Sequence, residues 1–299
     1  MSEKLINSTD EWLPGFFLDQ PIFRDISALA STFSEYVAWP ELKDFNHLLS
    51  ISAGPLQSGN SKNLKFIKQS LKPATLDQSY EIRIHQSGEI LTRQNNWHDF
   101  FQVMIWCTYP QTKKLINAMH FSAIMERSNK KDFSSIRSPI ENTLTLFDEC
   151  GAVIVSSNPE YFEMIKNHQW KKLFVTSRNA FNHEIKCFIF GHAMLEKALN
   201  PYSGMTVHSI LIKVDNSFFS KKDTDQRNKI DEIACQYFRK NKQPLTKNLQ
   251  PFPVLGVPEW HPLNNAEEYY NDETYFRVTP NSNKVITVFE YQDDNHSTR

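Results

Sequence analysis

The longest nearly apolar stretch of the chain comes directly after a polar one. Residues 100–107, FFQVMIWC, are apolar on almost every side, and Asn95-Asn96 precedes them as a helix start. A helix that lacks a polar face is expected to be buried. Pro110 ends or kinks this helix, and a second helix is predicted over residues 111–126.

Two other stretches have the pattern of β-hairpins. In residues 80–92, Ile82 and Ile84 alternate with polar neighbours before a Ser-Gly turn. In residues 144–155, the β-rich arms LTLF and AVIV flank Asp-Glu-Cys-Gly, and Gly151 can supply the left-handed residue of a bulged turn. Both are predicted to be hairpins, and the second has the strongest hairpin pattern in the chain.

The remaining pattern predicts three helices and two strands. The helices cover residues 159–167, 185–199 and 223–240, and the strands cover residues 207–215 and 285–291. The segment PFPVLGVPEW is too rich in proline for a regular element and too apolar for a solvated loop, so it is expected to pack irregularly on the core. Helices and hairpins are segregated instead of repeating as βαβ units. The sequence therefore predicts an α+β fold, a helix-rich single domain with β-hairpins and a small, mostly antiparallel sheet.

No linker rich in Pro, Ser or Gly divides the middle of the chain. One domain is expected over residues 13–292, with a less regular part at 13–79 and the main blocks at 80–280. Flexible ends are expected at residues 1–12 and 293–299.

Composition excludes several classes of protein. The chain has 33 Lys and Arg against 34 Asp and Glu, so no net field attracts it to nucleic acid or to a membrane surface. It has only 8 glycines and contains neither GxGxxG nor GxxxxGK[ST], which removes the main support for dinucleotide and P-loop sites. A nuclease would need a basic groove that the sequence does not indicate.

Location follows from the apolar runs and the cysteines. The longest apolar run is far below the ~20 residues of a membrane span, and the first residues lack the apolar segment of a signal peptide. The 4 cysteines form no CxxC pair. We therefore expect a cytoplasmic protein with reduced thiols.

A polar cluster from Arg93 to Asp99 lies at the start of the apolar helix. Such a junction can present side chains and free N–H groups to an anion or a substrate. Capping would explain Asn96, and Asp99 three residues later, equally well. Capping does not explain His98, which lies in the first turn of a buried helix, and Gln102 shares its face.

His192 and Glu196 are four residues apart and so lie on one face of a predicted helix. This spacing can bind a metal ion, or it can orient an imidazole for proton transfer. An ordinary hydrogen bond within the helix is the simpler explanation. The apolar residues around the pair favour a functional role, because a buried histidine needs a partner.

Other polar residues have a simple structural explanation. His120 and His208 fall on apolar faces and are more often core histidines than ligands. Asp148 and Glu149 could form a pair of catalytic carboxylates or a solvated turn. Arg277 could bind an anion or pack at the surface. No GxSxG motif and no cysteine in a basic sequence points to covalent catalysis.

Several blocks of the sequence resemble one family. TRQNNWHDFFQVMIW with YPQTK, then LTLFDECG, FGHAMLEK, and PFPVLGVPEW with YFR, are similar in this order to an uncharacterised bacterial family, domain of unknown function 3025. The resemblance covers residues 83–280 and implies one compact domain in a cytoplasmic bacterial protein. It implies no activity. Gln102 and Glu259 depart from the family pattern, which has Asn and Gly there. The polar residues shared with the pattern are Arg93, Asn96, His98, Asp99, Lys113, Asp148, Glu149, His192, Glu196 and Arg277.

These observations lead to one main hypothesis. A pocket is expected between the helix that starts at Trp97 and the helix that holds His192, where ionisable residues converge among apolar ones. The pocket would catalyse general acid–base or metal-assisted hydrolysis of a small polar substrate. The candidate catalytic residues are His98, His192, Glu196, Asp99 and Asp148; the candidate ligands of a divalent metal are His98, His192 and Glu196; the candidate substrate-binding residues are Arg93, Asn96, Gln102 and Arg277.

The alternative is a non-catalytic binding protein or scaffold. In that case the same polar side chains form a buried network that fixes how the helices pack. The two hypotheses differ in one structural expectation: the scaffold has no cavity beside His192, and the hydrolase has one.

Overall fold

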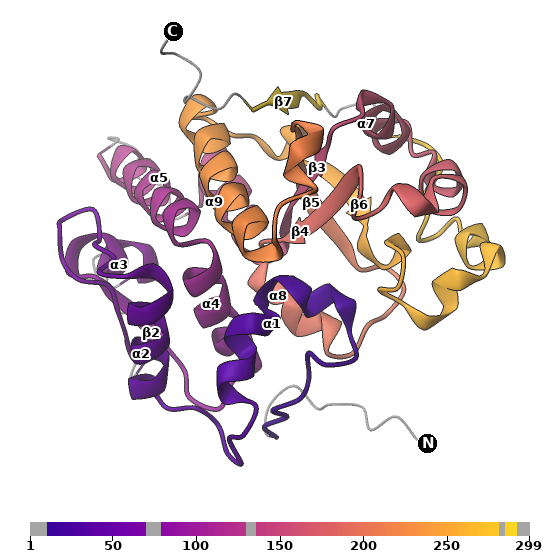
Figure 1. Ribbon diagram of the computed structural model, residues 1–299. Helices are drawn as coiled ribbons and strands as arrows, with labels where there is room; N and C mark the ends of the chain where they lie inside the picture. Colours follow the sequence, from indigo (N-terminus) through magenta and orange to yellow (C-terminus); the bar gives the residue numbers. More distant parts are fainter. Residues whose placement is uncertain (1–10, 70–78, 130–135, 281–284, 292–299) are drawn as a thin grey trace, which may run out of the picture.

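A computed structural model describes residues 11–69, 79–129, 136–280 and 285–291. Its centre is a five-stranded mixed sheet with the order β4-β3-β5-β6, in which β7 also pairs with β5 (Figure 1). The strands are β3 (Gly151–Ser156), β4 (Ile185–Ile189), β5 (Thr206–Lys213), β6 (Gln250–Pro253) and β7 (Val288–Glu290).

The sheet is mixed, whereas the sequence predicted a mostly antiparallel one. β3 pairs antiparallel with β4 but parallel with β5, and β5 pairs antiparallel with β6 but parallel with β7. Every residue of β3 and β4 is buried, as expected for strands covered on both faces. The fold class is nevertheless α+β and helix-rich, as predicted.

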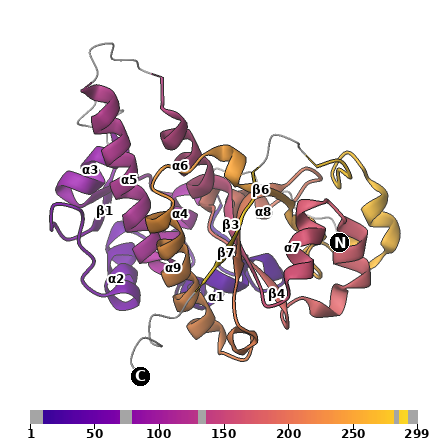
Figure 2. The same ribbon diagram turned by 90° about the horizontal axis from the view of Figure 1, so that it is seen from above.

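Helices cover both sides of the sheet. In both views α4 (Trp97–Thr108), α5 (Pro110–Ser128) and α9 (Asp223–Lys240) lie on one side of the sheet, and α7 (Pro159–Lys166) lies on the other (Figure 1, Figure 2). α6 (Pro139–Cys150) packs against α5, α8, β3 and β5. Within the part of the chain described here, no helix combines the length and apolar character needed to cross a lipid bilayer.

Most of the N-terminal part lies beyond α4 and α5, away from the sheet (Figure 2). It consists of α2 (Leu42–Ala53), α3 (Tyr80–Ser87) and a parallel pair of strands, β1 (Lys65–Lys68) and β2 (Glu89–Thr92), with α1 (Arg24–Ala30) beside α4. Aromatic rings join this part to α4. Trp97 stacks on Trp12 with the ring centroids 5.2 Å apart and meets Trp39 at 4.8 Å.

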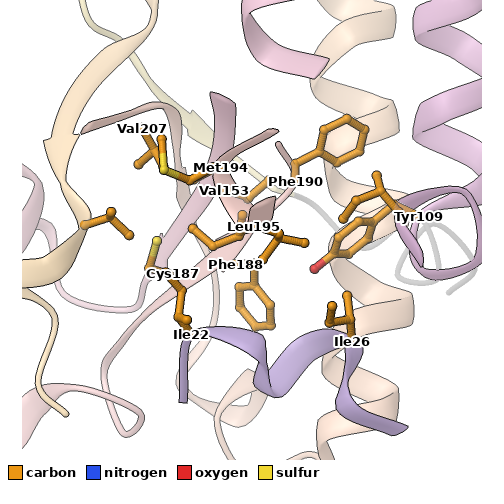
Figure 3. Close-up of a cluster of buried hydrophobic side chains, with 14 of the residues drawn as sticks. Ile22, Ile26, Tyr109, Val153, Cys187, Phe188, Phe190, Met194, Leu195 and Val207 are labelled. Atoms are coloured by element: carbon orange, nitrogen blue, oxygen red, sulfur yellow. The ribbon is translucent and has the colours of Figure 1, made fainter. Parts of the chain in front are cut away.

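The short helix α8 (His192–Ala198) is held by the main core. Figure 3 shows Met194 and Leu195 of α8 among Val153 of β3, Phe188 of β4 and Ile26 of α1. These five side chains are at most 1% exposed. The main neighbours of α8 are α4 and α6, with β4 beside them, so the position of α8, and of His192 at its start, is fixed by packing.

Both predicted hairpins are wrong. Residues 80–92 form α3 followed by β2, and Gly88, with φ of +71°, ends the helix instead of turning a hairpin. In residues 144–155 the LTLF arm is the last part of α6, which begins with a capping box between Ser138 and Glu141. Buried Leu144 and Phe147 are three residues apart, which is a helical spacing.

The predicted helix over residues 185–199 is also partly wrong, because its first half is β4 and only its second half is α8. The other predictions agree closely with the structure. Helices were predicted where α4, α5, α7 and α9 lie, and strands were predicted where β5 and β7 lie. The segment 251–260 was expected to hold no regular element, and this is wrong for residues 251–253, which belong to β6 and pair with β5; the turn of 3-10 helix that follows is buried, as expected for a segment packed on the core.

Candidate functional site

Two histidines from separate helices meet at the edge of the core. The side chain of Asn96 accepts a hydrogen bond from the backbone N–H of Asp99 at 3.1 Å, which starts α4 and places His98 in its first turn. His192 is the first residue of α8. The Nε2 atoms of His98 and His192 lie 3.0 Å apart, with the ring planes at 77°.

Gly191 makes this meeting possible. A Cβ atom at this position would lie 2.4 Å from the backbone oxygen of Glu149, so only glycine lets α8 begin directly against the end of α6. The N–H of Gly191 donates to the backbone oxygen of Gly151 at 2.8 Å. As a result, Nδ1 of His192 lies 2.8 Å from the backbone oxygen of Asp148.

These contacts determine where the protons are. A backbone oxygen can only accept, so Nδ1 of His192 carries a proton and donates to Asp148. Burial lowers the pKa of His192 to about 4, so its ring is neutral at pH 7 and Nε2 is an acceptor. His98 must then donate from Nε2. Its Nδ1 lies 2.9 Å from Oε2 of Glu196, so these two groups share a proton in a hydrogen bond.

A buried ion pair lies at the His192 end of this network. Nζ of Lys113 lies 2.6 Å from Oδ1 of Asp148, and the two side chains are 3% and 13% exposed. Burial alone would raise the pKa of Asp148, but the charge of Lys113 and its hydrogen bond oppose burial, and the pKa lies below its ordinary value. Asp148 is therefore an anion 3.6 Å from Nδ1 of His192.

The network borders a cavity of about 330 Å³. This volume is at the lower end of the range for small-molecule sites. The cavity is enclosed by α3, α4, α5, α6 and α8. Among the residues that line it are His98, Gln102, His120, Arg127, Asp148 and His192.

Several predicted site residues come together as expected. His98, His192, Glu196 and Asp148 form one connected group, and Gln102 lines the same cavity. Asp148 does so from the last turn of a helix, although a hairpin tip was expected there.

For Asn96 and Asp99 the structure agrees with the capping alternative, and Arg93 is bound to Asp99 instead of facing the cavity. Asn96 caps α4, and the buried carboxylate of Asp99 accepts a hydrogen bond from Nη2 of Arg93 at 2.7 Å. None of the three lines the cavity. They form a capping corner between β2 and α4, in which polar groups satisfy one another.

Arg277 also lies outside the site. Its backbone oxygen accepts hydrogen bonds from Trp170 and His168, both at 2.9 Å, and its side chain is exposed. It does not line the cavity.

The proposed metal ligands do not converge on one point. Glu196 contacts Nδ1 of His98, whereas His192 meets the same ring at Nε2, and these two nitrogens point away from each other. An ion held by both Nε2 atoms would therefore lie out of reach of Glu196. In the described ranges, no group of three or more His, Cys, Asp and Glu side chains is arranged to hold a metal ion. The residues present do not fit the metal set that the sequence indicated.

Sequence reasoning missed two residues of the site. His120 was interpreted as a core histidine because Ile116 and Ile124 lie one turn away, and it is only 4% exposed, but it lines the cavity. Lys113 was noted only for the family resemblance. The long polar side chain of Lys113 inside an otherwise buried turn of α5 was the available indication, since lysine is rarely buried without a partner.

Comparison with known proteins finds a match to one protein family. No curated protein and no solved structure matches the chain. The family described as "Protein of unknown function (DUF3025)" matches residues 64–279, which include every member of the histidine network and every residue that lines the cavity. The chain thus belongs to this family of proteins of unknown function.

Proposed function

We propose that this protein is a hydrolase that acts on a small polar substrate, with His98 and His192 as its acid–base pair. The observation that carries the proposal is the hydrogen-bonded series from Glu196 through both histidines to Asp148, located at the wall of a cavity. Groups of this kind, buried and coupled beside a cavity, are typical of active sites.

The two histidines can supply the base and the acid that hydrolysis needs. Nε2 of neutral His192 has a lone pair that can accept a proton from an attacking water molecule. Nε2 of His98 carries a proton that can be given to a leaving group. In the proposed reaction, substrate and water replace the hydrogen bond between the two rings, and each Nε2 then faces the reacting atoms. The Asp148 backbone oxygen fixes the tautomer of His192, and the Glu196 carboxyl group orients the His98 ring through Nδ1.

The alternative of a non-catalytic binding protein or scaffold uses the same residues as a structural network. The cavity beside His192 supports the hydrolase over a purely structural role, because a network that only fixes helix packing needs no open space. We place the activity in the cytoplasm, since all four cysteines are free thiols.

The proposal is tested with purified protein and three chromogenic substrates: p-nitrophenyl acetate, p-nitrophenyl phosphate and L-alanine p-nitroanilide. Turnover of at least one is expected, falling about 100-fold or more in His98→Gln and in His192→Gln. His183→Gln is the matched control, because His183 is an exposed histidine that does not line the cavity.

The melting temperature separates the two functions. Loss of turnover in both cavity variants with little change in melting temperature supports the hydrolase. Absence of turnover in the unaltered protein, or turnover that survives in both variants, overturns it. Absence of turnover together with a large drop in melting temperature in His192→Gln supports the scaffold.

A further inference from the structure

The charged side chains of the cavity wall are paired with other protein groups. Arg127 forms two hydrogen bonds to Glu141, at 2.8 and 3.0 Å, and Asp148 is paired with Lys113. A carboxylate oxygen of Glu81 accepts a hydrogen bond from Asn117 at 2.6 Å. Among the described residues that line the cavity, the charged side chains that are exposed, Arg137 and Glu149, have opposite signs. The wall therefore offers no spare charge of one sign to a bound ion.

Three other polar side chains at the same wall, Gln102, His120 and Ser79, have no such partners among the described residues. Gln102 is 8% exposed and His120 is 4% exposed, yet neither side chain makes a hydrogen bond to any residue in the described ranges. Ser79 begins α3, but its buried hydroxyl makes no capping bond and has no partner within the same ranges. These polar groups are therefore available to a ligand in the cavity, and hydrogen bonds from a ligand would satisfy them.

We propose that the cavity binds the carboxamide group of a small ligand, with Gln102 as its main partner and His120 and Ser79 beside it. A carboxamide is planar, uncharged, and both donates and accepts. It can pair with the Gln102 amide by two reciprocal hydrogen bonds, and the imidazole and the hydroxyl can each donate or accept as well. This inference rests on the proposed function, since it names the substrate class of the same site.

A negatively charged ligand fits the cavity less well. A carboxylate would lie near the anionic side chain of Asp148, while the nearby cations Lys113 and Arg127 already serve Asp148 and Glu141. It would also offer no donor to the side-chain oxygen of Gln102, which would stay without a partner while the ligand lost its hydration. A hydroxyl group avoids the repulsion but cannot make the reciprocal pair with Gln102.

The test uses three ligands of nearly the same shape: benzamide, benzoate and benzyl alcohol. Their binding is measured by ¹H–¹⁵N chemical-shift titration of the protein at pH 7. Benzamide has 9 non-hydrogen atoms, so saturable binding in roughly the millimolar to micromolar range is expected. Benzoate and benzyl alcohol should bind about tenfold more weakly, a difference of about 1.4 kcal/mol.

A near-isosteric substitution makes the test sharper. Gln102→Glu replaces the amide with a carboxylate. The affinity of this variant for benzamide should fall about tenfold, and its affinity for the cation benzamidine should rise. Gln102→Met should lose benzamide binding without gaining benzamidine. Gln111→Glu is the matched control, since Gln111 is exposed on α5 and does not line the cavity, and it should change neither affinity.

The outcomes separate this inference from the proposed function. No saturable response to benzamide, or benzoate or benzyl alcohol binding as tightly, overturns the carboxamide inference, whatever the enzyme assays show. Affinity for benzamide that does not change in Gln102→Glu or Gln102→Met also overturns it. Benzamide binding that depends on Gln102, in a protein without turnover, supports the inference and contradicts only the hydrolase.

Discussion

The first turns of α4 contain two sets of polar residues with opposite properties. Arg93, Asn96 and Asp99 bond to one another at the capping corner, and none of them faces the cavity. His98 and Gln102 lie on the adjacent face and line the cavity, where His98 meets another helix and the Gln102 side chain has no hydrogen-bond partner among the residues that the structure describes. The two sets overlap in sequence, so position along the chain does not distinguish them. The first set has its hydrogen bonds satisfied within the capping corner, and the second set does not.

The ion pairs of the two regions differ in the same way. The side chain of Arg93 is 51% exposed in its pair with Asp99, whereas Lys113 is only 3% exposed in its pair with Asp148. Water screens the first pair, and protein surrounds the second. The capping corner therefore stabilises mainly the start of α4. In the cavity wall, each buried charge depends on its partner for stabilisation.

The largest expected effect on stability is that of breaking the buried pair. Lys113→Met leaves the Asp148 carboxylate buried without its cation, and it should lower the free energy of unfolding by about 3 kcal/mol. Arg93→Met breaks the half-exposed pair and should cost only about 1 kcal/mol. Urea unfolding measures both. Equal losses in the two variants would show that the regions do not differ as described.

The next effect is a dependence of stability on pH. His192 has a pKa of about 4 in the folded chain against 6.5 when unfolded, so the unfolded chain takes up this proton first as the pH falls. Stability should drop by about 3 kcal/mol between pH 6.5 and pH 4 through this residue, and the drop should not continue below pH 4.

His192→Gln provides the comparison for this pH dependence. Unfolding of both proteins is measured by urea at several pH values from 7 to 4. The difference in stability between them should change with pH across that interval and be constant above it. A difference that is the same at every pH would mean that His192 is not held neutral by burial.

The smallest effect is expected at the capping corner. Asn96→Ala removes the side-chain cap of α4 and should lower the free energy of unfolding by about 1 kcal/mol. Benzamide affinity and any turnover should remain the same within about twofold, because Asn96 satisfies only the backbone of its own helix. Loss of affinity in this variant, comparable to that in Gln102→Met, would mean that the corner and the cavity act as one unit.

Much of the helical structure could be predicted from the sequence, because the relevant determinants are local. Asn96 before an apolar run predicts the start of α4, and Pro110 predicts the junction with α5. The LTLF segment was misread because four apolar and β-branched residues fit a strand as well as a helix. The capping box of Ser138 and Glu141, six residues earlier, decides for the helix.

The site could be predicted only in part. The spacing of His192 and Glu196 and the position of His98 indicated the network, because polar residues embedded in apolar helices need partners. The position of His120 at the cavity wall could not be predicted. A histidine on an apolar helix face can point into a core or into a cavity, and the choice depends on α3 and α6, which come from other parts of the chain.

The central claim is that His98 donates a proton from Nε2 to Nε2 of a neutral His192, and long-range ¹H–¹⁵N NMR of their side chains at pH 7 tests it most directly. His98→Gln and His192→Gln spectra provide the assignments. The account predicts a neutral His192 with its proton on Nδ1 and a His98 with a proton on Nε2. A charged His192, or one with its proton on Nε2, would contradict the account.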